Sequence, residues 1–343
     1  MSAMSSIAYL FPGQGSQIVG MGRELAQMSA RARETFEEAD RVLGFALSKL
    51  CFEGPEAILN DTTHAQPAIF TTSIAALEAL GEAILGPHGP RLTAEPASDD
   101  APRGVALLPA DVRPAFVAGH SLGEYTALAA AGVLSFRDAL RLVAERGNLA
   151  ATRGAKGSMA AVVGMDAARV DQVIRESGCA DDVVVANDNG PLQVTIAGSH
   201  AGVDAVVLAL RDRGARRVVP LKISAPFHFP PMGRIADDLR EFMRSLRFRE
   251  PVVPVIANID ALPHINAAEI PDALAKHLSS RVEWLRSVRF MVQQNVSTFV
   301  ELGAGQVVSG LVKRVAEQAA LLNVSDAPSL LATLRELTGK AAK

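Results

Sequence analysis

Cysteine is scarce in this 343-residue chain, and neither sign of charge dominates it. The two cysteines, Cys51 and Cys179, lie far apart in the sequence and cannot build a disulfide framework or a multi-cysteine metal site, which suits a reducing cytoplasm. With 34 basic and 37 acidic residues the formal net charge is −3, so no overall basic field favours nucleic acid or an anionic membrane. We therefore expect a cytoplasmic protein that binds neither.

Long apolar runs and metal-binding patterns are also missing. No segment reaches about 18 uncharged apolar residues, and the N-terminus lacks a basic stretch followed by an apolar one, so neither membrane spanning nor export is indicated. The seven histidines show no H-E-x-x-H or similar spacing, and we predict no metal. What the chain has instead is 49% hydrophobic residues, enough for the core of one large domain or two smaller ones.

The most informative segment is the pentapeptide Gly-His-Ser-Leu-Gly at residues 119–123. It follows a short apolar run (115–118) and opens an alanine-rich stretch (124–131), which is the strand, turn and helix context of a serine nucleophile elbow. The glycines on either side of Ser121 remove side chains where strand and helix would collide, and free amides at the helix start can stabilise an oxyanion. The alternative is a glycine-bounded turn in which Ser121 only caps the helix.

A second helix is predicted from Ser135, which has capping-box spacing with Asp138, to about residue 150. Three apolar residues and Arg146 recur on it with the spacing of one helix face, so Arg146 lies on the apolar stripe. A guanidinium there needs an anionic partner, because an unpaired buried charge costs several kcal/mol. That partner is either a carboxylate of this chain or one of a ligand, and the spacing alone does not choose between them.

The pattern changes between residues 159 and 221. Strands and helices follow in the order βαββαβ, which is typical of a ferredoxin-like unit. The strands are predicted at 159–164, 183–186, 194–197 and 217–221, and the helices at 166–176 and 201–213. Strand-then-helix alternation resumes after this unit. We predict an α/β fold with a larger body, residues 1–154 and 222–343, and an inserted subdomain, residues 155–221.

A serine nucleophile needs a base to take its proton, and histidine titrates in the right range. His228 stands where the chain re-enters the body after the inserted unit, and clefts at such junctions are common ligand sites. The alternative for His228 is a solvated or core-edge position. His120 is the rival base, but as the immediate neighbour of Ser121 at a sharp turn it should point elsewhere.

Five motifs follow one another along the chain: Phe11-Pro12-Gly13-Gln14-Gly15-Ser16-Gln17, Gly119-His120-Ser121-Leu122-Gly123-Glu124-Tyr125, Glu145-Arg146-Gly147, Ala225-Pro226-Phe227-His228 and Val300-Glu301-Leu302-Gly303. In order and approximate spacing they resemble the malonyl-CoA:acyl carrier protein transacylases and the acyltransferases of polyketide synthases, over about residues 5 to 318. The resemblance implies an α/β-hydrolase-like body with a ferredoxin-like insertion, in agreement with the element order above. It also implies transfer of a malonyl or related dicarboxylic acyl group from coenzyme A to acyl carrier protein, in fatty acid or polyketide synthesis, with no cofactor beyond the coenzyme A thioester that is the substrate.

The resemblance assigns roles to single residues. Ser121 would be the nucleophile and His228 the base that activates it. Arg146 would pair bidentately with the free carboxylate of malonate, a geometry that lysine could not reproduce. The backbone amides of Gln14 and Leu122 would form the oxyanion hole.

Phe227 stands where malonyl-selective polyketide acyltransferases often carry phenylalanine, and its ring should crowd an α-methyl group. The chain also departs from the family pattern. His277 replaces the glutamine of many relatives at a position whose main-chain carbonyl orients the catalytic histidine, and it adds a titratable group near the site. Phe229, where relatives usually have a small residue, would narrow or reshape the acyl pocket. Residues 86–114, rich in Pro, Gly, Ala and Asp, exceed the usual length and predict an exposed loop, the best candidate for disorder.

Three functions compete at this point. The first is a transacylase that works through an acyl-serine intermediate, with malonyl-CoA and acyl carrier protein as partners. The second is an acyl hydrolase of the same family, although a hydrolase has no need of a malonate-clamping Arg146. The third is a non-catalytic module that docks carrier protein, which Ser121 and His228 together disfavour. An acidic carrier protein would need a local basic surface, and two clusters of basic residues could supply it. The alternative for each cluster is a solvated helix end with no binding role. The candidates are Arg211, Arg213, Arg216 and Arg217, or Lys313 and Arg314.

Overall fold

The computed structural model describes residues 6–98, 100–223 and 225–339 of the chain. Five strands in it form a parallel sheet in the order β7-β2-β1-β8-β9. They are β1 (Ser6–Phe11), β2 (Phe116–Gly119), β7 (Val255–Ile256), β8 (Val296–Leu302) and β9 (Ala320–Val324). The central strand β1 is buried along almost its whole length, as expected for a parallel strand covered on both faces.

Helices cover the parallel sheet on both sides, and the side chains of β1 alternate between them. Ile7 and Tyr9 belong to the larger core with α5 to α7, whereas Ala8 and Leu10 pack in a second core with α12 and α13. The helices of this body are α1 (Arg23–Met28), α2 (Ala30–Leu43), α3 (Leu47–Glu53), α4 (Glu56–Leu59), α5 (Thr62–Leu85), α6 (Gly123–Ala130), α7 (Phe136–Thr152), α10 (Ala236–Met243), α11 (Ile270–His277), α12 (Trp284–Gln293), α13 (Val307–Val312) and α14 (Ala327–Thr338). Short 3-10 helices add η1 (Gly104–Leu107), η2 (Pro230–Ile235) and η3 (Ala267–Glu269).

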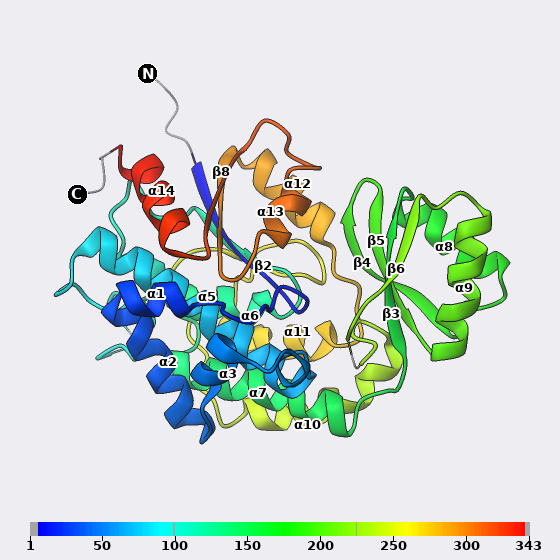
Figure 1. Cartoon of the computed structure of the whole chain (residues 1–343), viewed down its shortest axis with the longest axis horizontal. Coiled ribbons are helices and arrows are strands. Elements are labelled where there is room, and N and C mark those ends of the chain that lie inside the picture. The colour runs from blue at the N-terminus through cyan, green and yellow to red at the C-terminus, as the bar shows by residue number, and fades with distance from the viewer. Residues whose placement is uncertain (1–5, 99, 224, 340–343) are drawn as a thin grey trace.

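A separate antiparallel sheet lies at one end of the molecule, with α8 and α9 packed on its outer face (Figure 1). Its strands run in the order β4-β5-β3-β6, and its core is distinct from the two cores of the body. The elements are β3 (Ser158–Val163), α8 (Ala167–Glu176), β4 (Val183–Gly190), β5 (Gln193–Gly198), α9 (His200–Asp212) and β6 (Arg217–Pro220). The predicted order βαββαβ is therefore present, with β4 running four residues further than its apolar stretch indicates.

One helix in the described ranges, α5, is long and apolar enough to cross a membrane by length and composition. Its apolar window is 78% buried within the protein, between α2, α7 and the parallel sheet. Helix α5 is thus a core helix, and its apolar character is used in packing against its neighbours.

The segment 86–114 contains only the short helix η1 among its described residues, but the expectation of an exposed loop is wrong for its first part, where Leu92 and Thr93 are buried. Arg31 donates to the carbonyl oxygens of Gly86, Gly89 and Pro90. The buried carboxylate of Glu78 accepts from both the backbone and the hydroxyl of Thr93. Two charged side chains of the body thus fasten the segment to α2 and α5; Asp99 within it lies outside the described residues.

Candidate active site

Ser121 stands between the end of β2 and the start of α6, on a backbone turn with a φ of 53°. A Cβ added at Gly119 would lie 1.9 Å from the carbonyl carbon of Gly123, and one added at Gly123 would lie 2.2 Å from the oxygen of Phe11. Both glycines are therefore required by close backbone approach, as the sequence predicts. The left-handed conformation of Ser121 is unfavourable for a residue with a side chain, and the surrounding contacts must hold it.

Asn258 supplies two of those contacts. Its side-chain oxygen accepts from the backbone N–H of Ser121 at 2.7 Å, and its amide nitrogen donates to the carbonyl of Gly119, also at 2.7 Å. Asn258 follows the edge strand β7, more than 130 residues after the turn that it holds. Sequence reasoning missed this residue, because no local pattern links it to the elbow.

The hydroxyl of Ser121 lies 2.7 Å from Nε2 of His228. On the other side of that ring, Nδ1 lies 2.9 Å from the carbonyl oxygen of His277 and 3.1 Å from that of Ser280. Carbonyl oxygens only accept, so Nδ1 carries the proton and Nε2 is left to accept from the serine. The carbonyl of His277 thus lies where the resemblance implies, whereas no sequence pattern points to its companion Ser280.

His228 is buried and has a φ of 63°. Burial, and after it the nearby charge of Arg146, lowers the pKa of His228 from 6.5 to about 3. The imidazole is therefore neutral at physiological pH, which is the state that can accept a proton from Ser121.

His120 points away from the serine hydroxyl, as expected for the neighbour of a sharp turn. Its Nε2 lies 2.7 Å from the side-chain oxygen of Asn189 on β4, and its ring contacts Trp284 edge-on. Burial lowers its pKa too. The geometry therefore pairs Ser121 with His228 and joins His120 to the antiparallel sheet.

Arg146 lies on the buried face of α7 and is only 2% exposed. Its Nη1 donates to the side-chain oxygen of Gln66 at 2.7 Å, while Nε and Nη2 are buried and lack a hydrogen-bond partner among the described residues. The guanidinium lies over the ring of Phe227 at 4.4 Å and over that of Tyr125 at 5.4 Å. Within the described ranges no carboxylate lies at ion-pair distance from it, so a direct internal salt bridge is not found. Burial lowers the pKa of Arg146, and the nearby Tyr125 and Glu124 raise it in part.

A cavity of about 210 Å³ opens beside Ser121 and His228. The body and the antiparallel sheet both line it. From the body come Gly13, Gln14, Gly15, His120, Ser121, Ile223, Phe227, His228, Val307, Val308 and Leu311, and from the inserted subdomain Met159, Ala161, Asn187, Asn189, Gln193, Thr195 and Leu221. The cavity therefore lies at the carboxyl ends of the parallel strands, the usual ligand position in open α/β sheets.

The remaining predicted site residues are placed differently. Phe227 lines the cavity, but Phe229 is buried in the main core and does not, so the expected effect of Phe229 on an acyl pocket is not supported. Gln14 lines the cavity, and its side chain donates to Thr62. Leu122 is the N-cap residue of α6, and in the described structure neither its backbone N–H nor that of Gln14 donates to another backbone group. The role of the two amides as an oxyanion hole stays a prediction, because Gln14 lines the cavity but Leu122 does not.

The imidazole of His277 lies against that of His228, with ring centroids 4.8 Å apart. Burial and neighbouring positive groups hold the pKa of His277 well below its usual value. Among the described residues no group of three or more His, Cys, Asp or Glu side chains could hold a metal ion.

The sequence matches the acyl transferase domain family over residues 8–87 and 106–337. The chain belongs to this family. The break at 88–105 falls within the long segment that Arg31 and Glu78 fasten to the body, so this acyltransferase carries an insertion there relative to the family pattern.

Several relatives of this acyltransferase share its whole length. It is 39% identical to the malonyl CoA-acyl carrier protein transacylase of Bacillus subtilis (strain 168), over 97% of this chain and 98% of the relative. Against the enzyme of the same name from Escherichia coli (strain K12) it is 36% identical, over 97% and 100%.

Two solved structures share the fold and much of the sequence. The acyl-carrier-protein-S-malonyltransferase of Bartonella henselae matches with a TM-score of 0.85 at 35% identity, over 97% of this chain and 99% of the other. A malonyl-transacylase solved in complex with its type II polyketide synthase acyl-carrier protein matches equally well, with a TM-score of 0.85 at 35% identity, over 97% and 100%.

Proposed function

We propose that this acyltransferase moves a malonyl group from coenzyme A to the phosphopantetheine thiol of an acyl carrier protein, in fatty acid or polyketide synthesis. The observation that carries the proposal is the guanidinium of Arg146, buried beside the Ser121–His228 pair with two nitrogens unpaired in the described structure. A buried, half-satisfied cation is costly unless a ligand completes it, and the free carboxylate of malonate has the required charge and fork geometry.

In the first half-reaction, His228 Nε2 takes the proton of Ser121 as its oxygen attacks the thioester carbonyl. The amides of Gln14 and Leu122 hold the oxyanion. When the tetrahedral intermediate collapses, the carbon–sulfur bond breaks and His228 returns the proton to the coenzyme A sulfur. Malonate is then an ester of Ser121, with its carboxylate on Arg146.

In the second half-reaction, His228 takes the proton of the carrier-protein thiol, and the thiolate attacks the acyl-serine. Ser121 leaves with the proton from His228, which restores the free enzyme. Phe227, against Arg146 at the cavity wall, excludes an α-methyl group by its bulk, although one methyl is worth only about 1–3 kcal/mol. No further cofactor is required.

The finer description of the fold belongs to the same proposal. The parallel-sheet body, residues 1–154 and 222–343, is α/β-hydrolase-like, and the inserted subdomain, residues 155–221, is ferredoxin-like. The sheet order β4-β5-β3-β6 and the helices α8 and α9 on one face support the second assignment. The enzyme acts in the cytoplasm, where the unpaired Cys51 and Cys179 stay reduced.

An acidic carrier protein docks near the end of α13. Val307, Val308 and Leu311 of this helix line the cavity, and the exposed Lys313 and Arg314 follow them directly. In the other basic cluster, Arg213 is already ion-paired with Glu176. Charge complementarity beside the cavity mouth therefore favours the α13 surface.

The test is the intact mass of the protein after incubation with malonyl-CoA, acetyl-CoA and methylmalonyl-CoA, each followed by carrier protein or by buffer alone. We expect a malonyl adduct that Ser121→Ala abolishes and that carrier protein discharges. A stable adduct on Ser121→Ala would place the nucleophile elsewhere. Rapid loss of the adduct in buffer alone would show that the protein is an acyl hydrolase. If no acyl-CoA formed an adduct, the non-catalytic docking module would be the function that remains.

A further inference from the structure

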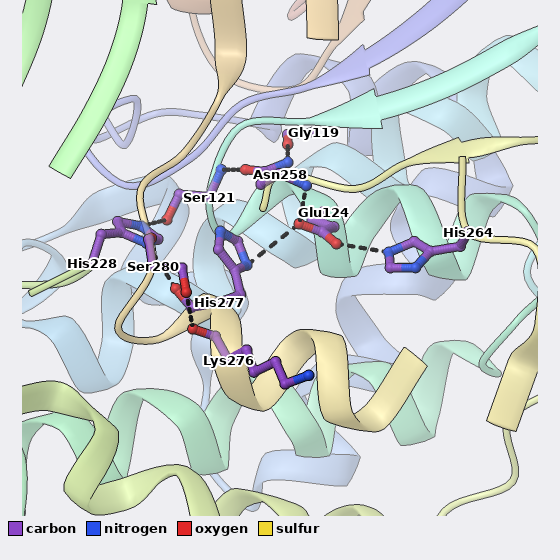
Figure 2. A network of polar contacts seen from close by, with 9 residues as sticks. All are labelled: Gly119, Ser121, Glu124, His228, Asn258, His264, Lys276, His277 and Ser280. Atoms are coloured by element: carbon purple, nitrogen blue, oxygen red, sulfur yellow. Dashed lines mark hydrogen bonds and ion pairs between the residues drawn. The ribbon is translucent and has the colours of Figure 1, made fainter. Parts of the chain in front are cut away.

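Glu124 is a buried carboxylate for which the proposed reaction has no direct use. It stands on the first turn of α6, three residues after Ser121, and is 1% exposed. Its Oε2 accepts from the backbone N–H of Asn258 at 3.1 Å, and its Oε1 lies 2.8 Å from Nε2 of His264. Oε2 also lies 3.3 Å from Nδ1 of His277. Three nitrogens therefore surround an acceptor-only group, as Figure 2 shows.

The first of these contacts leads to the nucleophile. Asn258 is held by Glu124 through its backbone, and its side chain grips the turn on both sides of the strained Ser121, at the N–H of Ser121 and the carbonyl of Gly119. A shift of Asn258 would therefore release the turn that presents the hydroxyl.

The second contact leads to the base. The imidazole of His277 reaches Glu124, while its backbone carbonyl, on the same residue, accepts from Nδ1 of His228. Figure 2 shows the ring of His277 between the carboxylate and the Ser121–His228 pair. Because its pKa is held well below the usual value, the ring is neutral. Its Nδ1 lies 3.3 Å from the carboxylate without the geometry of a hydrogen bond, so the ring acts as a close packing contact between Glu124 and His228.

We propose that Glu124 is the positioning residue for both members of the catalytic pair, acting through Asn258 on Ser121 and through His277 on His228. His264 donates a hydrogen bond to the other oxygen of the carboxylate. Both Ser121 and His228 have a positive φ, so each needs restraint from outside its own segment, and one carboxylate provides it for both. The inference rests on the proposed function only in taking Ser121 and His228 as the reacting pair.

The test compares variants that keep or remove a polar side chain at position 277. His277→Leu replaces the polar ring that contacts Glu124 by an apolar side chain of similar bulk, and we expect kcat for Ser121 acylation by malonyl-CoA to fall about 10- to 100-fold with little change in KM. His277→Gln retains a side-chain N–H and should restore the rate to within about fivefold of wild type, the worth of one altered hydrogen bond. Glu124→Gln should behave like His277→Leu, and the double variant should lose little more than either single one.

Each variant is also labelled with a fluorophosphonate, which reacts with an activated serine whatever the acyl specificity. The labelling rates of the variants should rank in the same order as their acylation rates. As a control, His88→Gln, at an exposed histidine, should leave both the acylation rate and the labelling rate unchanged. Thermal unfolding shows whether each variant is folded. If Glu124→Gln fails to fold, the comparison of His277→Leu with His277→Gln still tests the proposal. Wild-type rates in His277→Leu with both reagents, or a change in KM alone, would overturn the proposal. If the wild-type protein reacted with the fluorophosphonate but with no acyl-CoA, the proposed function would be refuted. The role of Glu124 would then be judged from the labelling rates of the variants alone.

Discussion

The parallel-sheet body and the antiparallel subdomain contribute different kinds of atoms to one cavity. From the body come the Ser121–His228 pair and Phe227, which line the cavity, and the buried cation of Arg146 packs against the ring of Phe227 without lining the cavity itself. The subdomain contributes apolar, amide and hydroxyl side chains, and none of its cavity-lining residues is titratable in the physiological range. The body holds the groups that can exchange protons, and the subdomain forms a wall that can shape and orient what enters.

The two regions meet in two ways: Met159, Ala186 and Ala197 of the subdomain pack in the main core of the body, and a short backbone junction joins the two. Val282 exchanges hydrogen bonds with β4, accepting from the N–H of Asp188 and donating to the carbonyl of Ala186. It follows Ser280, whose carbonyl faces His228, by only two residues. The segment that orients His228 therefore also binds the subdomain to the body. This shared segment can hold the subdomain side of the cavity at a constant distance from Ser121 and His228.

The largest effect should come from the body's base. His228→Ala removes the proton acceptor, and we expect acylation of Ser121 to slow by about four to six orders of magnitude with the fold intact. His120→Ala, at the rival histidine that contacts the subdomain, should be far milder. Single-turnover acylation with malonyl-CoA measures both. If His120→Ala were the crippling change, the base would belong to the junction with the subdomain and the contrast between the regions would fail.

The next effect concerns the acyl group. Arg146→Ala should lower kcat/KM for malonyl-CoA between about 30-fold and several-thousand-fold, because the substrate carboxylate loses a buried partner. Acetyl transfer should hold or rise, since no unpaired cation then faces the methyl group. Arg141→Ala, on the exposed face of the same helix, is the matched control. An unchanged malonyl-to-acetyl ratio would make Arg146 a structural residue that rests on Phe227 and Tyr125.

A smaller effect should appear in the pH profile. The folded pKa of His228 lies far below 6.5 because of burial and the charge of Arg146, so the base stays neutral as pH falls through the usual histidine range. We expect kcat/KM for malonyl-CoA to show no acid limb between pH 8 and 5.5. Arg146→Ala removes one of the causes that lower the pKa of His228. Any fall of kcat/KM at acid pH should therefore begin at a higher pH in this variant than in the wild type. A wild-type profile that falls about tenfold per pH unit below 6.5 would contradict the buried, neutral base.

Much of this arrangement could be predicted because it is local. Gly119 and Gly123 identify the elbow, because a side chain at either position would collide with the neighbouring backbone. Helical spacing alone places Arg146 on the buried face of its helix. The βαββαβ order of the subdomain follows from apolar periodicity. Such features depend on residues a few positions apart, where the geometry of the chain is nearly fixed.

The rest depends on contacts between distant segments, which no spacing records. Asn258 and His264 reach Glu124 from more than 130 residues away. Phe229 follows His228 directly, yet the positive φ of His228 turns the chain so that Phe229 enters the core instead of the cavity. A prediction from sequence neighbours therefore named Ser121 and His228, which the structure brings into contact, but it misplaced the side chain of Phe229 and did not include the residues that hold the pair.

The smallest expected effect tests the wall. Asn189, on β4, contacts Nε2 of His120 through its oxygen and donates to the hydroxyl of Thr195 through its nitrogen, so its amide is fixed in orientation while it lines the cavity. Because Asn189 touches neither Ser121 nor His228, Asn189→Ala should raise KM for malonyl-CoA about fivefold, the worth of one hydrogen bond, and leave kcat nearly unchanged. Gln172→Ala, at an exposed position on α8 of the same subdomain, should change neither constant. If Asn189→Ala instead lowered kcat with KM unchanged, the subdomain would act on the transition state itself, and the division between a reactive body and an orienting wall would have to be given up.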